Sequence, residues 1–142
     1  MDFLNEGKEI MLLPRSSFLE ITHLINPGVP GDECFFIKAN AAVNLAQYSV
    51  LLGLLTEGSI IPYTNFHLWL GDVYVEENTQ ILIFTGKGQR RYTKTMDGHP
   101  MIVMFWGLDK TIFNDGNHLP VLVQIGSISL PPKHPLQLAK PQ

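Results

Sequence analysis

The sequence of 142 residues contains only one cysteine and has no excess of basic residues. A single thiol excludes an internal disulfide framework and a zinc site built from several cysteines. The formal net charge of −3 excludes a uniformly basic nucleic-acid binder. Cys34 lies in an apolar run with Phe35 and Phe36, so we expect a small buried side chain at this position.

The sequence also lacks a segment that would direct the chain to a membrane. Residues 1–14 carry acidic side chains where a secretory signal needs basic ones, and their apolar run is short. The longest apolar tract, residues 41–55, is interrupted by Asn44 and Gln47 and is too short to span a bilayer. We therefore expect a cytoplasmic protein that does not enter a membrane.

Charged residues are scarce, and turn-forming residues are frequent. Charged side chains make up 16% of the chain, which also contains 10 prolines and 12 glycines, so we expect many turns and short strands. The length suits one ordinary domain. We expect an N-terminal arm at residues 1–14, a single domain at residues 15–130 and a proline-rich tail at residues 131–142.

Short apolar segments with alternating polarity indicate that the domain is built from strands. The strand candidates are residues 17–25, 32–39, 59–62, 66–75, 79–85, 101–106 and 120–130. Residues 41–55 differ, because their composition favours a helix capped by Asn40, although parts of the segment alternate at the strand period. Many short strands predict a β-sandwich or a barrel.

Three segments, in order along the chain, resemble the lamin-tail domain, also called the intermediate-filament tail domain. In residues 33–50, ECFFIKANAAVNLAQYSV, a glutamate opens one strand and a V-x-L-x-x-Y pattern forms another. Residues 83–88, IFTGKG, are similar to the family's TGxG hairpin. The third segment is FWG at residues 105–107, followed by IFNDG at residues 112–116. The resemblance implies an all-β, immunoglobulin-like β-sandwich, with a loop and a strand instead of a helix at residues 41–55.

The basic residues gather in one short stretch. Lys87, Arg90, Arg91 and Lys94 lie close together with no acidic residue among them, and Tyr92 lies between them. Such a stretch suits an anionic partner, because Lys and Arg bind phosphate or carboxylate groups and an aromatic ring stacks on bases. It equally suits a solvated arm that protects an edge strand. These five residues are the candidate binding residues, and both interpretations remain open.

The glycines in this stretch do not match a nucleotide-binding loop. Gly86-Lys87-Gly88 is followed by Gln89, so the Ser or Thr that follows the lysine of a P-loop is missing. A dinucleotide-binding loop needs a third glycine and a helix after it, and the sequence predicts neither. We expect Gly86 and Gly88 to provide positive φ angles in a turn, in agreement with the family's hairpin.

Residues suited to catalysis or metal binding are scattered. Asp97 and His99 form one loop segment, and Asp115 and His118 form another; the two segments could meet and hold a transition metal. Turn formation accounts for the same residues without a metal. The sequence shows no Ser-His-Asp or Cys-His arrangement. We therefore expect no catalytic residues, no metal and no cofactor.

The resemblance implies a non-catalytic interaction or scaffolding module of lamin-tail type. Such a module would bind a protein partner through an edge strand or through the basic hairpin of residues 87–94. The alternative is a nucleic-acid-binding accessory protein that uses the same hairpin. Exposed strand edges also admit a homodimer.

Overall fold

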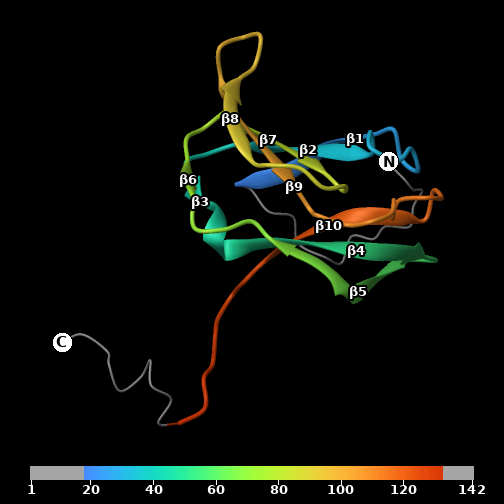
Figure 1. Ribbon diagram of the computed structural model, residues 1–142. Helices are drawn as coiled ribbons and strands as arrows, with labels where there is room; N and C mark the ends of the chain where they lie inside the picture. Colours follow the sequence, from blue (N-terminus) through green and yellow to red (C-terminus); the bar gives the residue numbers. More distant parts are fainter. Residues whose placement is uncertain (1–17, 133–142) are drawn as a thin grey trace.

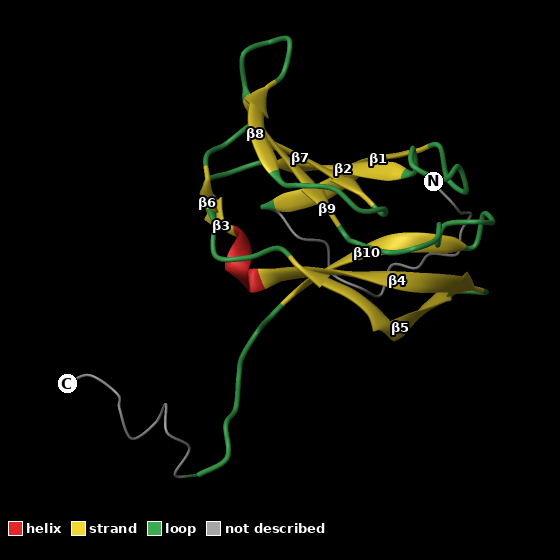
Figure 2. Ribbon diagram, viewed as in Figure 1, coloured by secondary structure: helices red, strands yellow, loops and turns green. Residues whose placement is uncertain are grey.

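The computed structural model describes residues 18–132, and within them nearly all regular structure is β (Figures 1 and 2). The first sheet has five strands, in the order β1 (Leu19–Ile25), β2 (Cys34–Ala39), β7 (Gln80–Phe84), β9 (Pro100–Phe105) and β8 (Arg91–Lys94). The second sheet has three strands, in the order β10 (His118–Gln124), β4 (Tyr48–Thr56) and β5 (Ser59–Trp69). Two short strands, β3 (Val43–Asn44) and β6 (Tyr74–Val75), pair with each other. The predicted arm at residues 1–14 lies outside the described residues, as does the predicted tail apart from its first two residues.

An apolar core lies between the two main sheets, which face each other as two layers in Figure 1. Successive side chains of a strand point to opposite faces, so alternate residues enter the core. The core residues include Phe35, Ile37, Ile81, Ile83, Ile102 and Met104 from the first sheet and Val50 and Leu52 from the second. This arrangement confirms the predicted all-β, sandwich-like fold. Among residues 18–132, no helix has the length and apolar character that a membrane crossing requires.

Residues 41–55 form no α-helix. They contain β3, a 3₁₀ turn (η1, Leu45–Gln47) and most of β4, as the resemblance implied. The side chain of Asn44 caps the turn by accepting a hydrogen bond from the Ala46 amide at 2.8 Å. The next strand, β4, then pairs with β10 on one side and β5 on the other. Pairing on both sides, together with burial of the strand's apolar face, outweighs the local helix propensity of the segment.

Two predicted strand boundaries differ in the structure. The candidates at residues 59–62 and 66–75 are joined in one strand, β5, which ends at Trp69 and contains an irregularity opposite Leu51 and Leu52. The closing strand predicted for residues 120–130 starts at His118 and ends at Gln124. Beyond Gln124, residues 125–130 are exposed and form no strand, because after the bond from the Ile125 amide to the Gln47 carbonyl they have no neighbouring strand among the described residues.

A buried carboxylate joins three separate loops. Glu33 is 1% exposed and immediately precedes β2. Its Oε1 accepts hydrogen bonds from the Thr85 hydroxyl at 2.8 Å and the Ile112 amide at 2.9 Å. Its Oε2 accepts hydrogen bonds from the amides of Gly28 at 2.7 Å and Phe113 at 3.0 Å. These four donors stabilise a buried charge that would otherwise be unfavourable.

Candidate functional site

The chain between β7 and β8 does not form a hairpin. β7 runs parallel to β9, and β8 pairs antiparallel with the opposite side of β9. Residues 85–90 therefore cross the end of β9, and the Gly107 amide donates a hydrogen bond to the Gly86 carbonyl at 2.9 Å during that crossing. The predicted TGxG hairpin after β7 is wrong, because residues 85–90 are a crossing loop. Residues 91–94 of the predicted basic hairpin form the edge strand β8, which is one arm of a hairpin with β9.

The two glycines of this loop have a different role from the predicted one. Neither Gly86 nor Gly88 is among the residues with positive φ. A Cβ atom at Gly88 would overlap the ring of Phe105, whereas a Cβ at Gly86 would have nothing within 4 Å. The Phe105 ring in turn stacks on Phe84, with 5.4 Å between the ring centroids. Gly88 thus allows the crossing loop to pass closely over the end of β9.

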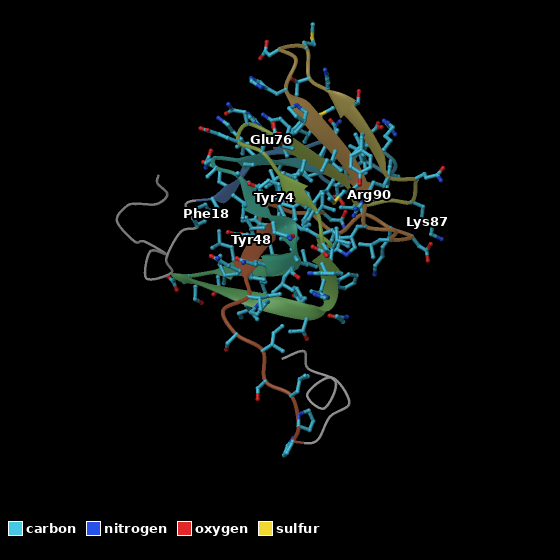
Figure 3. The ribbon with its side chains drawn as sticks, turned by 90° about the vertical axis from the view of Figure 1, so that its left-hand side faces the viewer. Phe18, Tyr48, Tyr74, Glu76, Lys87 and Arg90 are labelled. Atoms are coloured by element: carbon cyan, nitrogen blue, oxygen red, sulfur yellow. The ribbon has the colours of Figure 1, made fainter. Side chains whose placement is uncertain are left out.

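Lys87, on the crossing loop, forms an ion pair with Asp109. Its Nζ lies 2.6 Å from Oδ1 of Asp109, and both side chains are largely exposed. The side-chain hydrogen bond raises the pKa of Lys87 and lowers the pKa of Asp109. Figure 3 shows Lys87 at the margin of the molecule, farther out than Arg90. The positive charge of Lys87 therefore has a partner within the protein.

Arg90 turns toward the connection between β5 and β6. Its Nη2 donates a long hydrogen bond of 3.5 Å to the Leu70 carbonyl. Its guanidinium nitrogens lie 3.8 Å from the position that a Cβ on Gly71 would occupy. Arg90 thus helps to hold the crossing loop against the neighbouring strand connection, and it does not extend in line with β8.

The remaining three candidates lie on β8, where every residue is exposed. Cross-strand partners in an antiparallel pair share a face of the sheet. Arg91 is paired with Val103 and lies on the outer face, whereas Tyr92 is paired with Ile102, a core residue, and lies on the inner face. Lys94 follows Tyr92 on the inner face by the alternation of a strand. The five predicted residues therefore do not form one continuous basic surface.

A cleft of about 260 Å³ lies beside β8, and the sequence did not indicate it. This β8 cleft is lined by Val73, Tyr74, Val75, Glu76, Thr79, Tyr92, Thr93, Pro100, Met101 and Ile102. Tyr74 and Tyr92 are 68% and 65% exposed. Oγ1 of Thr79 is buried and has no hydrogen-bond partner among the described residues. An unpaired buried hydroxyl costs about 1–3 kcal/mol of stability.

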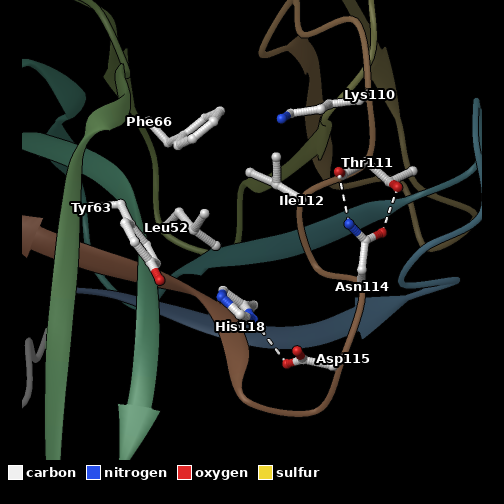
Figure 4. A pocket seen from close by; sticks show the side chains of 9 residues that line it. All are labelled: Leu52, Tyr63, Phe66, Lys110, Thr111, Ile112, Asn114, Asp115 and His118. Carbon is white, nitrogen blue, oxygen red and sulfur yellow. Dashed lines mark hydrogen bonds and ion pairs between the residues drawn. The ribbon is translucent and has the colours of Figure 1, made fainter.

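A second cleft, of about 340 Å³, lies on another part of the molecule (Figure 4). This β5 cleft is lined by Leu52, Tyr63, Phe66, Lys110, Thr111, Ile112, Asn114, Asp115 and His118. His118 Nδ1 lies 2.8 Å from Oδ1 of Asp115, and this hydrogen bond lowers the pKa of Asp115. Asp97 and His99 do not join these two residues in a metal-binding group, because no three His, Cys, Asp or Glu residues in the described part of the chain are grouped for a metal.

No family model matches the chain, and neither a curated protein nor a solved structure matches it. The resemblance to the lamin-tail domain therefore stays a prediction. The all-β architecture and the position of β8 at an edge of its sheet come from the structure itself.

Proposed function

We propose that this protein is a non-catalytic interaction module that binds an extended, acidic segment of a protein partner along the edge of β8. The observation that carries the proposal is the combination of an edge strand and a cleft. Within residues 18–132, β8 pairs with β9 alone, and the β8 cleft opens beside it. An added strand gains main-chain hydrogen bonds from an edge, and neighbouring pockets select its side chains.

Charge favours an acidic partner at this edge. Arg91 and Lys94 are exposed at the two ends of β8, and no acidic residue lies between them. If two copies paired β8 with β8 in antiparallel register, Arg91 of one copy would lie opposite Lys94 of the other. Like charges directly opposite each other destabilise a strand pair. The edge is therefore protected against self-association but suited to a strand that carries Glu or Asp, so any homodimer would use another surface.

The arrangement of the basic residues favours a protein over a nucleic acid. A phosphodiester backbone needs cations along one continuous track. Here Lys87 is paired with Asp109 and Arg90 contacts Leu70, while Arg91 and Lys94 lie on opposite faces of β8.

The proposed module is an immunoglobulin-like sandwich of lamin-tail type. A core between two sheets and the strand at residues 48–56 support this assignment.

Selection from a library of displayed nine-residue peptides tests the proposal. We expect the protein to enrich peptides that alternate acidic and β-branched residues. Synthetic versions of the enriched peptides should shift the amide resonances of residues 91–94 in the nuclear magnetic resonance (NMR) spectrum. Methylation of alternate backbone nitrogens in these peptides should abolish binding, because it removes main-chain donors.

The matched variants are Arg91→Glu/Lys94→Glu at the edge and Lys38→Gln on β2. The double variant should lose at least about tenfold in peptide affinity, whereas Lys38→Gln should bind as the wild type does. Equal binding to the double variant would refute the edge as the site. A single-stranded oligonucleotide serves as the competing probe: tight binding at low salt that weakens steeply as salt rises would instead support the nucleic-acid alternative.

A further inference from the structure

The β5 cleft has the features of a site for a small ligand and shares no residue with the β8 cleft. Its walls are mainly apolar, as small-molecule sites are, and a few polar groups converge on it. Leu52 and Ile112, each 5% exposed, form part of the lining, and the partly buried rings of Tyr63 and Phe66 form another part. A planar apolar body can pack against these side chains.

One positive charge is already positioned at this cleft. Lys110 Nζ lies 5.7 Å from the centroid of the Phe66 ring, and Figure 4 shows the side chain extending over the cleft toward that ring. The attraction between an ammonium group and the face of an aromatic ring restricts where the charge lies. The described residues place no carboxylate within ion-pair distance of Lys110, in contrast to Lys87 with its partner Asp109. Lys110 is thus available to an anion from outside.

A histidine at the same cleft contributes a second polar group. His118 is held by two contacts: Nδ1 is hydrogen-bonded to Asp115, and the ring stacks on Tyr63 with 5.8 Å between centroids and 15° between planes. The contact with Asp115 leaves Nε2 without a partner among the described residues. Asp115 lies on the same rim and would repel a second negative charge. The lining therefore suits a ligand with one negative charge.

We infer that the β5 cleft binds a small monocarboxylate with a planar apolar body. The carboxylate lies at the Lys110 ammonium, and the planar body packs against Phe66, Leu52 and Ile112. His118 Nε2 is the neighbouring polar group at the lower side of the cleft in Figure 4. Binding here does not depend on the proposed peptide site on β8.

Titration with benzoate, followed by amide NMR, tests the inference. Benzoate is the probe, and benzyl alcohol and benzylammonium are matched compounds without the negative charge. We expect saturable shifts at Thr111, Ile112 and His118 with a Kd on the order of 1 mM, a usual affinity for so small a ligand. Benzyl alcohol should bind at least about fivefold more weakly than benzoate, and benzylammonium more weakly still.

Lysine variants test whether binding depends on the positive charge and not only on the shape of the cleft. Lys110→Gln should weaken benzoate at least about fivefold while leaving benzyl alcohol unchanged, and Lys110→Arg should restore benzoate binding. Lys38→Gln, which removes a lysine from β2, should have no effect. The inference is overturned if benzoate gives no saturable shifts at these amides up to 20 times the expected Kd. It is equally overturned if Lys110→Gln binds benzoate as tightly as the wild type.

Discussion

At the scale of single residues, Glu33 links segments of the chain that are distant in sequence. Its buried carboxylate accepts four hydrogen bonds from residues that lie far apart in the sequence, including those from the Ile112 and Phe113 amides. A carboxylate is well suited to this position because both of its oxygens only accept hydrogen bonds when it is ionised. A glutamine side chain has the same shape, but its NH₂ group cannot accept the hydrogen bonds that one of the two carboxylate oxygens accepts.

Glu33→Gln should therefore lower the free energy of unfolding by about 2–4 kcal/mol, since buried donors lose their acceptor. Urea denaturation followed by circular dichroism measures this change. Glu57→Gln is the matched control, because Glu57 is exposed in the turn between β4 and β5 and should change stability by less than about 0.5 kcal/mol. Equal denaturation midpoints for the wild type and Glu33→Gln would contradict the assigned role.

The ion pair between Lys87 and Asp109 gives a prediction about pH. Because the pKa of Asp109 is lowered in the folded protein, the pair contributes stability above the unfolded-state pKa, and this contribution is lost as the pH falls through the folded-state pKa. In Lys87→Gln, the Asp109 pKa should rise toward the usual value of an exposed aspartate. An NMR titration of the Asp109 side chain measures it, with Lys38→Gln as the control. An unchanged Asp109 pKa in Lys87→Gln would show that the pair does not form in solution.

At the scale of elements, local sequence predicted where strands lie better than which strands pair. The apolar segments at residues 79–85 and 101–106 correspond to β7 and β9. The parallel pairing of β7 with β9, which separates β7 from β8, could not be inferred, because a glycine-rich loop after a strand usually indicates a hairpin. Its actual path depends on the space above Phe105, which is a property of the folded molecule.

The same limitation applies to the candidate site. The sequence indicated the basic residues, and the structure places Arg91, Tyr92 and Lys94 on one strand, with Arg91 and Lys94 on opposite faces. The sequence did not indicate Tyr74 or Thr79. Tyr74 lines the β8 cleft from β6, and Thr79 lines it from the connection after β6. Contacts between strands that are distant in sequence leave no periodic pattern, so sequence periodicity could not reveal them.

The crossing loop gives a prediction that compares its two glycines. Gly88→Ala should destabilise the protein by about 1–3 kcal/mol, because the added methyl group would displace the Phe105 ring. Gly86→Ala should not destabilise it, since its Cβ position is open and its φ is not positive. Thermal or urea denaturation measures both variants. If both alanines were tolerated equally, the close approach of the loop to Phe105 would not be needed for the fold.

At the scale of the whole molecule, the two sheets depend on each other for burial. Phe113, which lies between β9 and β10, is fully buried and contacts Phe35 and Trp106 edge-on, at 5.9 and 6.4 Å between centroids. Neither sheet keeps a buried face without the other, because the core residues of each pack against the opposite sheet. A single cooperative unfolding transition is expected of such a domain.

The two tryptophans allow this cooperativity to be measured layer by layer. Trp69 is the last residue of β5 in the three-stranded sheet. Trp106 follows β9 of the five-stranded sheet and packs against the core. Trp106→Phe leaves Trp69 as the single tryptophan whose fluorescence is followed, and Trp69→Phe leaves Trp106. For each variant, the fluorescence transition in urea should coincide with the transition measured by far-ultraviolet circular dichroism, because both sheets lose the same core at once. The two variants need not have equal midpoints, since Trp106 is partly buried against the core and Trp69 is 49% exposed. A Trp69 transition at lower urea than the circular dichroism transition of the same variant would instead mean that the three-stranded sheet detaches first, leaving the five-stranded sheet and its β8 edge folded alone.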